Sequence, residues 1–107
     1  MRIWDIAPDK LCRKHLLGEH RELHALYSIL LEDKKAYRNH PETKRWEGKL
    51  PALKLRHEKL AKEMGKRGYN HKTPLEDTSG EKTQKQLWQT VEEQEKILKQ
   101  KGCECRV

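Results

Sequence analysis

The chain has 107 residues, of which 38% are charged and 34% apolar, and its mean hydropathy is −1.14. This length suits a single domain with a modest hydrophobic core, so we expect residues 1–107 to form one domain. Runs of alternating β-branched residues are missing, which argues against a β-sandwich or a parallel sheet. No signal peptide is recognised, and no apolar run approaches the roughly 18 residues of a membrane span, so a cytoplasmic protein without a membrane partner is expected.

The formal net charge of +7 is concentrated in the first part of the chain. Residues 1–75 hold 18 Lys and Arg against 10 Asp and Glu, whereas residues 76–107 hold 6 against 7. A basic body of this kind favours a polyanionic partner, which usually means nucleic acid. A lysine-rich surface that is merely solvated has the same composition, so the charge alone leaves both interpretations open.

The first six residues, MRIWDI, are partly apolar and lack a helical pattern. We expect Ile3, Trp4 and Ile6 to hold this arm against the body of the protein, which would fix the position of the terminal amine. A first helix is predicted from about Pro8 to Glu32, because proline suits the first turn of a helix.

One face of this predicted helix is apolar, and polar residues intrude on it. At 100° per residue the apolar face holds Cys12, Leu16, Leu23, Leu26, Tyr27 and Leu30. His15, Glu19 and Glu22 follow one another at i, i+4 and i+7, which places them along a ridge about 10 Å long. A buried carboxylate without a partner is too costly. The ridge is therefore either an ion-pair network with an arginine from a neighbouring helix or part of an active site.

A second helix is predicted after a loop at residues 33–50, which has a possible short turn at Glu42–Glu47. Pro51 opens or kinks this helix, and it ends near Gly65–Gly68, with Gly68 as the C′ residue. Its core stripe comprises Leu50, Leu53, His57, Leu60 and Met64, in which His57 is interpreted as a core histidine. The opposite side carries Arg45, Lys49, Arg56, Lys59, Lys62 and Lys66. This side could follow DNA phosphates, although a solvated basic face would look the same.

The last part of the chain is predicted to hold a linker at residues 72–80 and a third helix from about Gly80 to Gln100. Thr78 followed by Glu81 resembles a capping box for that helix. Its sparse apolar side comprises Leu87, Val91, Ile97 and Leu98, with Trp88 at one edge of the core. Residues 101–107 are expected to be flexible.

The three cysteines are interpreted as thiols without a metal. Cys12 falls on the apolar face of the first helix and suits a small core residue. Cys103 and Cys105 form a C-x-C pair, but no second pair stands at zinc-finger spacing. Loose terminal thiols are therefore preferred to a metal site, and no cofactor is expected.

Three motifs resemble the pyrimidine-dimer DNA glycosylase/AP lyase family. The first is HLLGEHREL at residues 15–23, which is similar to the family's H-L-[ML]-x-E-[YH]-R-E-L signature. The second is KRGYNHK at residues 66–72, and the third, weaker motif is EKI at residues 95–97. The resemblance spans roughly residues 1–98. It implies an all-α fold of three main helices with the N-terminal segment threaded between them.

The resemblance also implies the chemistry. In this family the α-amine of the N-terminal residue attacks C1′ of the damaged nucleotide, releases the base and forms an imine with the sugar. Elimination then cuts the strand on the 3′ side. The essential carboxylate corresponds to Glu22, with Arg21 and His15 as neighbouring basic positions. The partner would be double-stranded DNA with pyrimidine dimers or abasic sites, bound by a monomer. The residues expected to contact DNA are Arg2, His15, Arg21, His24, Arg45, Lys49, Arg56 and Lys66.

Met1 is the predicted nucleophile, because counting back from the first motif without gaps places the catalytic amine there and bulky Arg2 favours its retention. An α-amine ordinarily titrates at about 7.7–8.0, well below a lysine at about 10.4, so a useful fraction is unprotonated at neutral pH. An AP lyase or a glycosylase for another lesion remains an alternative. So does a helical module that binds nucleic acid without catalysis.

Overall fold

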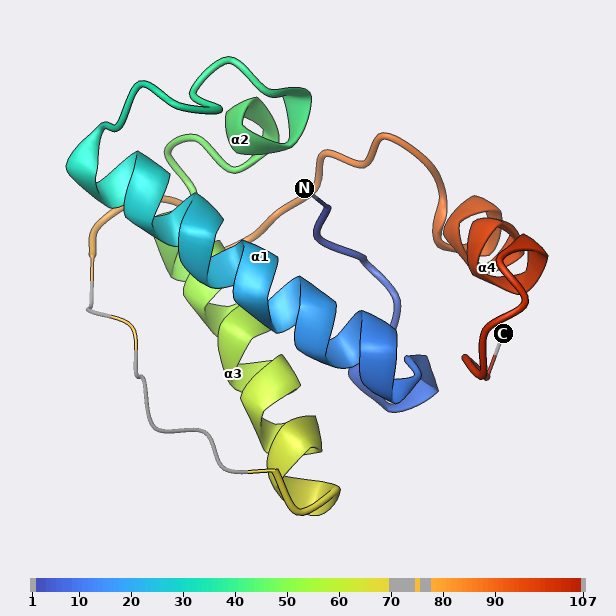
Figure 1. Ribbon diagram of the computed structural model, residues 1–107. Coiled ribbons are helices and arrows are strands. Elements are labelled where there is room, and N and C mark those ends of the chain that lie inside the picture. Colours follow the sequence, from blue (N-terminus) through green and yellow to red (C-terminus); the bar gives the residue numbers. More distant parts are fainter. Residues whose placement is uncertain (1, 70–74, 76–77, 107) are drawn as a thin grey trace.

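The computed structural model describes residues 2–69, 75 and 78–106, which form helices and connecting segments with no strand among them. A 3₁₀ turn, η1 (Pro8–Lys10), precedes helices α1 (Arg13–Glu32), α2 (Pro41–Arg45), α3 (Leu50–Lys66) and α4 (Val91–Gln100). Helices α1 and α3 pack side by side, while α4 lies apart from them beyond the N-terminal segment (Figure 1). The all-α prediction is confirmed. None of the helices in the described ranges has the length and apolar character needed to cross a membrane.

Helix α1 begins at Arg13, five residues later than predicted. Pro8 does start a helical turn, but that turn ends after Lys10, and Leu11 leaves it with extended backbone angles of φ −78° and ψ 138°. The cause is packing, because the Leu11 side chain is buried in the core at 2% exposure. Cys12 is then the N-cap residue of α1, also with an extended backbone.

The apolar stripes of α1 and α3 form the core as predicted. The buried members are Leu16, Leu23, Leu26 and Tyr27 of α1 and Leu53, His57, Leu60 and Met64 of α3. Helix α3 ends in a Schellman motif, since Tyr69 N–H donates to Met64 O at 2.9 Å and Gly68 N–H to Gly65 O at 3.1 Å. Gly68 has φ +85°, which confirms it as the C′ residue.

Helix α4 begins at Val91, so the prediction of a helix from Gly80 is wrong. Its true start is a capping box in which Thr90 and Glu93 each bond the backbone of the other. The predicted box at Thr78 is not formed, because the Thr78 hydroxyl lies 3.4 Å from that of Tyr27. Glu81 instead joins the loop before α3 through its backbone, with its N–H donating to Gly48 O at 2.9 Å. Leu87 and Trp88 remain 43% and 49% exposed.

The N-terminal segment is buried in the core. Ile3, Trp4 and Ile6 are exposed by only 1%, 6% and 0%, which confirms that they hold the segment against the body of the protein. Arg56 of α3 donates to Ile6 O at 2.8 Å, and Gln94 of α4 accepts from Asp5 N–H at 2.8 Å. Threading of the segment between the three main helices stays a prediction.

Arg45 of α2 is the buried cation that ties this segment to the rest of the chain. Its guanidinium pairs with Glu42 and with Asp5, the latter at 2.9 Å, and donates to the carbonyl oxygens of Ile3 at 2.9 Å and Gln86 at 3.0 Å. At 1% exposure it cannot reach a DNA phosphate without unfolding this region. We therefore assign Arg45 a structural role in place of the predicted phosphate contact.

Replacing Arg45 by Met is expected to lower the free energy of unfolding by about 3–5 kcal/mol, because Asp5 and Glu42 would keep their charges without the buried partner. Urea denaturation measures this loss. Lys44→Met is the matched control, since Lys44 is the exposed neighbour in the same helix, and its cost should stay within about 0.5 kcal/mol. Equal costs for the two variants would contradict the role given to Arg45.

Candidate active site

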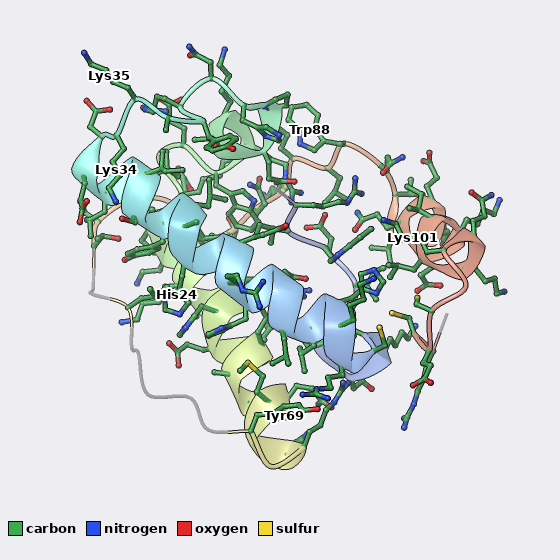
Figure 2. All side chains as sticks on the ribbon, viewed as in Figure 1. His24, Lys34, Lys35, Tyr69, Trp88 and Lys101 are labelled. Atoms are coloured by element: carbon green, nitrogen blue, oxygen red, sulfur yellow. The ribbon has the colours of Figure 1, made fainter. Side chains whose placement is uncertain are left out.

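A pocket of about 360 Å³ opens where the N-terminal segment, α1 and α4 meet. Its lining residues are Arg2, Trp4, Lys14, His15, Gly18, Glu19, Glu22, Ile97 and Lys101. The ridge of His15, Glu19 and Glu22 predicted on α1 thus forms one wall of a single pocket. Lys101, labelled in Figure 2, comes from the turn after α4.

Glu22 contacts the start of the chain. Its Oε2 accepts a hydrogen bond of 2.7 Å from the backbone N–H of Arg2, and its side chain is only partly buried. A carboxylate that accepts from an amide makes a charge-assisted bond, which is stronger than a neutral one. Glu22 is therefore held beside the first peptide bond of the chain, inside the pocket.

The Arg2 side chain contacts Trp4 and Gln89. Its guanidinium lies over the Trp4 ring, 4.4 Å from the centroid, and donates to Gln89 Oε1 at 2.7 Å. Its Nε is buried and has no hydrogen-bond partner among the described residues. A buried donor of this kind, in a cationic side chain at the pocket, suits an anionic ligand.

Glu19 has a different role from Glu22. It is buried at 2% exposure, and Arg56 of α3 donates to both of its oxygens, at 2.7 and 2.9 Å. Burial raises the pKa of the Glu19 carboxyl, and the charge of Arg56 opposes that shift. The ion-pair interpretation of the ridge is thus right for Glu19. Because Arg56 is 11% exposed and occupied by Glu19, we assign it a structural role rather than the predicted phosphate contact.

His15 lies at the end of the pocket nearest the C-terminal tail. Burial lowers its pKa, with smaller contributions from Lys101 and Lys14, so its ring is neutral at neutral pH. The ring meets Trp4 edge to face at 6.1 Å between centroids. Its Nδ1 is 3.1 Å from Cys12 Sγ and 3.4 Å from Cys105 Sγ.

Arg21 lines an adjoining pocket of about 690 Å³. The lining residues of this second pocket are Cys12, Arg13, Lys14, Leu17, Gly18, Arg21, Cys103 and Glu104. Lys14 and Gly18 belong to both pockets, so the two hollows share one rim. The exposed cations Arg13, Lys14, Arg21 and Lys101 surround this rim.

The remaining predicted DNA contacts lie at several separate places. Lys66 is exposed at the end of α3, where a small hollow of about 230 Å³ also includes Lys59 and Lys62. Lys49 is partly buried and donates to Gln84 Oε1 at 2.8 Å. Met1, the predicted nucleophile, lies outside the described residues.

His24 belongs to a histidine cluster rather than to the pocket. Its Nε2 is 3.2 Å from His20 Nε2 and 3.0 Å from His57 Nε2. Residues two positions apart on a helix differ by about 200° in direction, so His24 and Glu22 point to different sides of α1. Figure 2 shows His24 on the side of α1 that faces α3. His57 is fully buried and hydrogen-bonded, which confirms the prediction of a core histidine.

The pocket contains residues that sequence reasoning missed. Gly18 is three residues from His15 and four from Glu22, and Lys14 is four residues before Gly18, so helical spacing could have identified both. Lys101 offers no such signal, because only the path of the chain after α4 brings it to the pocket.

Comparison with known proteins identifies the family. Residues 1–77 match the family model described as pyrimidine dimer DNA glycosylase, which covers most of the chain and includes Arg2, His15 and Glu22. Searches of the curated proteins and of the solved structures gave no significant match. The chain therefore belongs to the pyrimidine dimer DNA glycosylase family, whose name implies a DNA glycosylase and a DNA substrate.

Proposed function

We propose that the protein is a monomeric, cytoplasmic DNA glycosylase with AP lyase activity, which acts on pyrimidine dimers or abasic sites through the amine of Met1. One observation carries the proposal. Glu22 Oε2 lies 2.7 Å from the backbone nitrogen of Arg2, so a carboxylate stands beside the first peptide bond in a pocket rimmed by cations.

The proposed nucleophile is three covalent bonds away from the atom that Glu22 binds. The amine of Met1 is joined to the Arg2 nitrogen through the Met1 Cα and carbonyl carbon alone. The segment after Met1 is anchored to the core by the burial of Ile3, Trp4 and Ile6. An amine joined to an anchored segment has less conformational freedom to lose than one at the end of a free chain, which supports covalent catalysis at this position.

The proposed reaction has two stages. The amine attacks C1′ of the damaged nucleotide, and the glycosidic bond breaks with its electron pair leaving on the base, which takes up a proton. The attached nitrogen loses a proton and its lone pair then expels O4′, which is protonated to a hydroxyl as the ring opens to an iminium ion. Loss of a C2′ proton then expels the 3′ phosphate oxygen and cuts the strand. The first stage develops positive charge at the sugar and ends in a cationic iminium, which the Glu22 carboxylate would stabilise, as an anion does in glycoside hydrolysis.

The cations around the two pockets are proposed to hold the DNA backbone. Arg13, Lys14, Arg21 and Lys101 are exposed there, and the Lys59–Lys62–Lys66 group of α3 extends the basic surface. Such contacts are independent of sequence and weaken as salt rises. C1′ inside a duplex is reached only when the DNA is distorted or a nucleotide is turned out, and a cationic rim would stabilise that state.

Thymine-dimer and abasic duplexes, tested side by side, check the proposed function. We expect both to be cut, with an unsaturated aldehyde at the 3′ end, because elimination rather than hydrolysis breaks the strand. Cleavage of the abasic duplex alone would restrict the protein to AP lyase activity. A free 3′ hydroxyl would identify a hydrolytic nuclease, and binding without any cleavage would identify a binding module.

A further inference from the structure

Four potential metal ligands converge beside the pocket, although the sequence separates them widely. Cys12 and His15 lie at the start of α1, whereas Cys103 and Cys105 lie in the tail after α4. Their ligand atoms, three sulfurs and one imidazole nitrogen, are all within 4.8 Å of one another. Figure 2 shows sulfur atoms gathered where the tail meets α1.

The spacing of these atoms suits a tetrahedral ion. Ligands at about 2.3 Å for sulfur and about 2.0–2.1 Å for nitrogen around Zn²⁺ lie roughly 3.6–3.8 Å from one another. The observed separations from His15 Nδ1 are 3.1 Å to Cys12 Sγ and 3.4 Å to Cys105 Sγ. Because all four ligand atoms lie within 4.8 Å of one another, changes of up to about 1 Å would bring their separations to these tetrahedral values.

Two local features favour thiolate ligands, although burial raises the pKa of the Cys105 thiol to about 12 and the Cys103 thiol donates to Leu98 O at 3.3 Å, so an ion would have to displace both protons. The backbone N–H of Cys12 donates to Cys105 Sγ at 3.1 Å, which is a contact that orients and stabilises a ligating sulfur. Cys12 caps the N-terminus of α1, where the helix dipole favours negative charge. Three thiolates and Zn²⁺ carry a net charge of −1, and the exposed cations Arg13, Lys14 and Lys101 lie close by.

We propose that Cys12, His15, Cys103 and Cys105 bind one structural Zn²⁺ ion. Four protein ligands close the coordination shell, so the ion takes no part in the chemistry, and a donor set of three thiolates and one imidazole selects zinc among the common divalent ions. This replaces the expectation of loose terminal thiols without a metal.

The ion would close a loop between the two ends of the fold. Besides the cysteines, the tail is joined to η1 by a hydrogen bond of 2.7 Å from Arg106 N–H to Lys10 O. A clip between residues this distant in sequence restricts the unfolded chain strongly. It would also hold Lys101 at the pocket. Ligation through Nδ1 would keep the His15 proton on Nε2 and so make that side of the ring a hydrogen-bond donor.

The histidine cluster is the natural control. His20, His24 and His57 also bring ligand atoms within 4.8 Å, but they offer three imidazoles without a thiolate, and the described residues supply no fourth ligand. An ion held there would therefore lack thiolate-to-metal absorption after exchange for cobalt, and it would survive substitution of the cysteines.

Native mass spectrometry of the untagged protein, purified from zinc-supplemented cells, tests the proposal independently of DNA cleavage. We expect one zinc ion per chain, lost in the Cys103→Ser/Cys105→Ser variant and kept in the His20→Asn/His24→Asn variant. Cobalt exchanged into the wild type should show thiolate-to-metal charge-transfer absorption, which does not require the cysteine variant to fold. Zinc that is absent, that survives the cysteine substitutions or that depends on the histidines would overturn the proposal. So would a disulfide between Cys12 and either tail cysteine.

Discussion

Glu22→Gln is expected to lower the rate of abasic-strand cleavage by at least about 100-fold, on the scale seen when a group that stabilises developing charge is lost. Glutamine keeps an oxygen that can accept from the Arg2 amide, so the 2.7 Å contact and the path of the N-terminal segment should remain. What the substitution removes is the negative charge beside the developing cation. Single-turnover cleavage of an abasic duplex measures the loss, and thermal unfolding should be nearly unchanged.

Two further substitutions show whether the effect belongs to this carboxylate. Glu92→Gln removes an exposed acid of α4 outside the pocket and should leave cleavage unchanged. Glu19→Gln leaves the nearly buried Arg56 without its charged partner, so its main effect should be a loss of stability of about 3–5 kcal/mol. Full activity of Glu22→Gln would remove the basis for placing the catalytic centre at this pocket.

Extending the chain before Met1 is expected to reduce cleavage by at least about 10³-fold, because a peptide nitrogen is not a nucleophile and enzymes that lose their nucleophile show losses of this size or larger. The Arg2 amide and the buried residues behind it are retained in the extended protein, so DNA binding should persist. Abasic-strand cleavage is the measurement.

A removable extension provides the control for this prediction. Proteolysis directly before Met1 should restore cleavage to the level of the unextended chain, whereas blocking the amine again by acetylation should abolish it. Undiminished cleavage by the intact extended protein would contradict catalysis by the terminal amine.

The core of the fold could be predicted from the sequence, because its signals are local. Leu16, Leu23 and Leu26 on α1 and Leu53 and Leu60 on α3 repeat at helical spacing, and they are buried. Gly68 was identified by its place after the last apolar residue of α3. Periodicity and end signals of this kind depend only on neighbouring residues.

The segment before α4 could not be predicted in this way. Residues 80–90 contain several good helix formers, yet distant partners hold them in an irregular path. Arg45 donates to Gln86 O at 3.0 Å, and the Gln84 side chain donates to Arg45 O at 2.7 Å. Such tertiary hydrogen bonds outweigh the few tenths of a kcal/mol that helix propensity contributes at each residue.

In the candidate site, too, local signals could be predicted from the sequence and distant contacts could not. Helical spacing identified His15, Glu19 and Glu22 as neighbours, and the resemblance singled out Glu22. The same spacing places Glu19 within the apolar face and Glu22 at its edge, where Glu22 faces the pocket, but it does not identify Arg56 as the partner of Glu19. The sequence predicts a loose tail for a similar reason, since nothing near Cys103 and Cys105 in sequence points to the start of α1.

Borohydride trapping on abasic DNA is the most direct test of amine catalysis. Hydride adds to the carbon–nitrogen double bond of the proposed imine and leaves a stable secondary amine, which links the protein to the sugar. Peptide mapping of the trapped complex should then locate the link at the α-nitrogen of Met1. A link at the side chain of an internal lysine, such as Lys14 or Lys101 at the pocket, or no trapped complex under conditions where the strand is cut, would contradict the account.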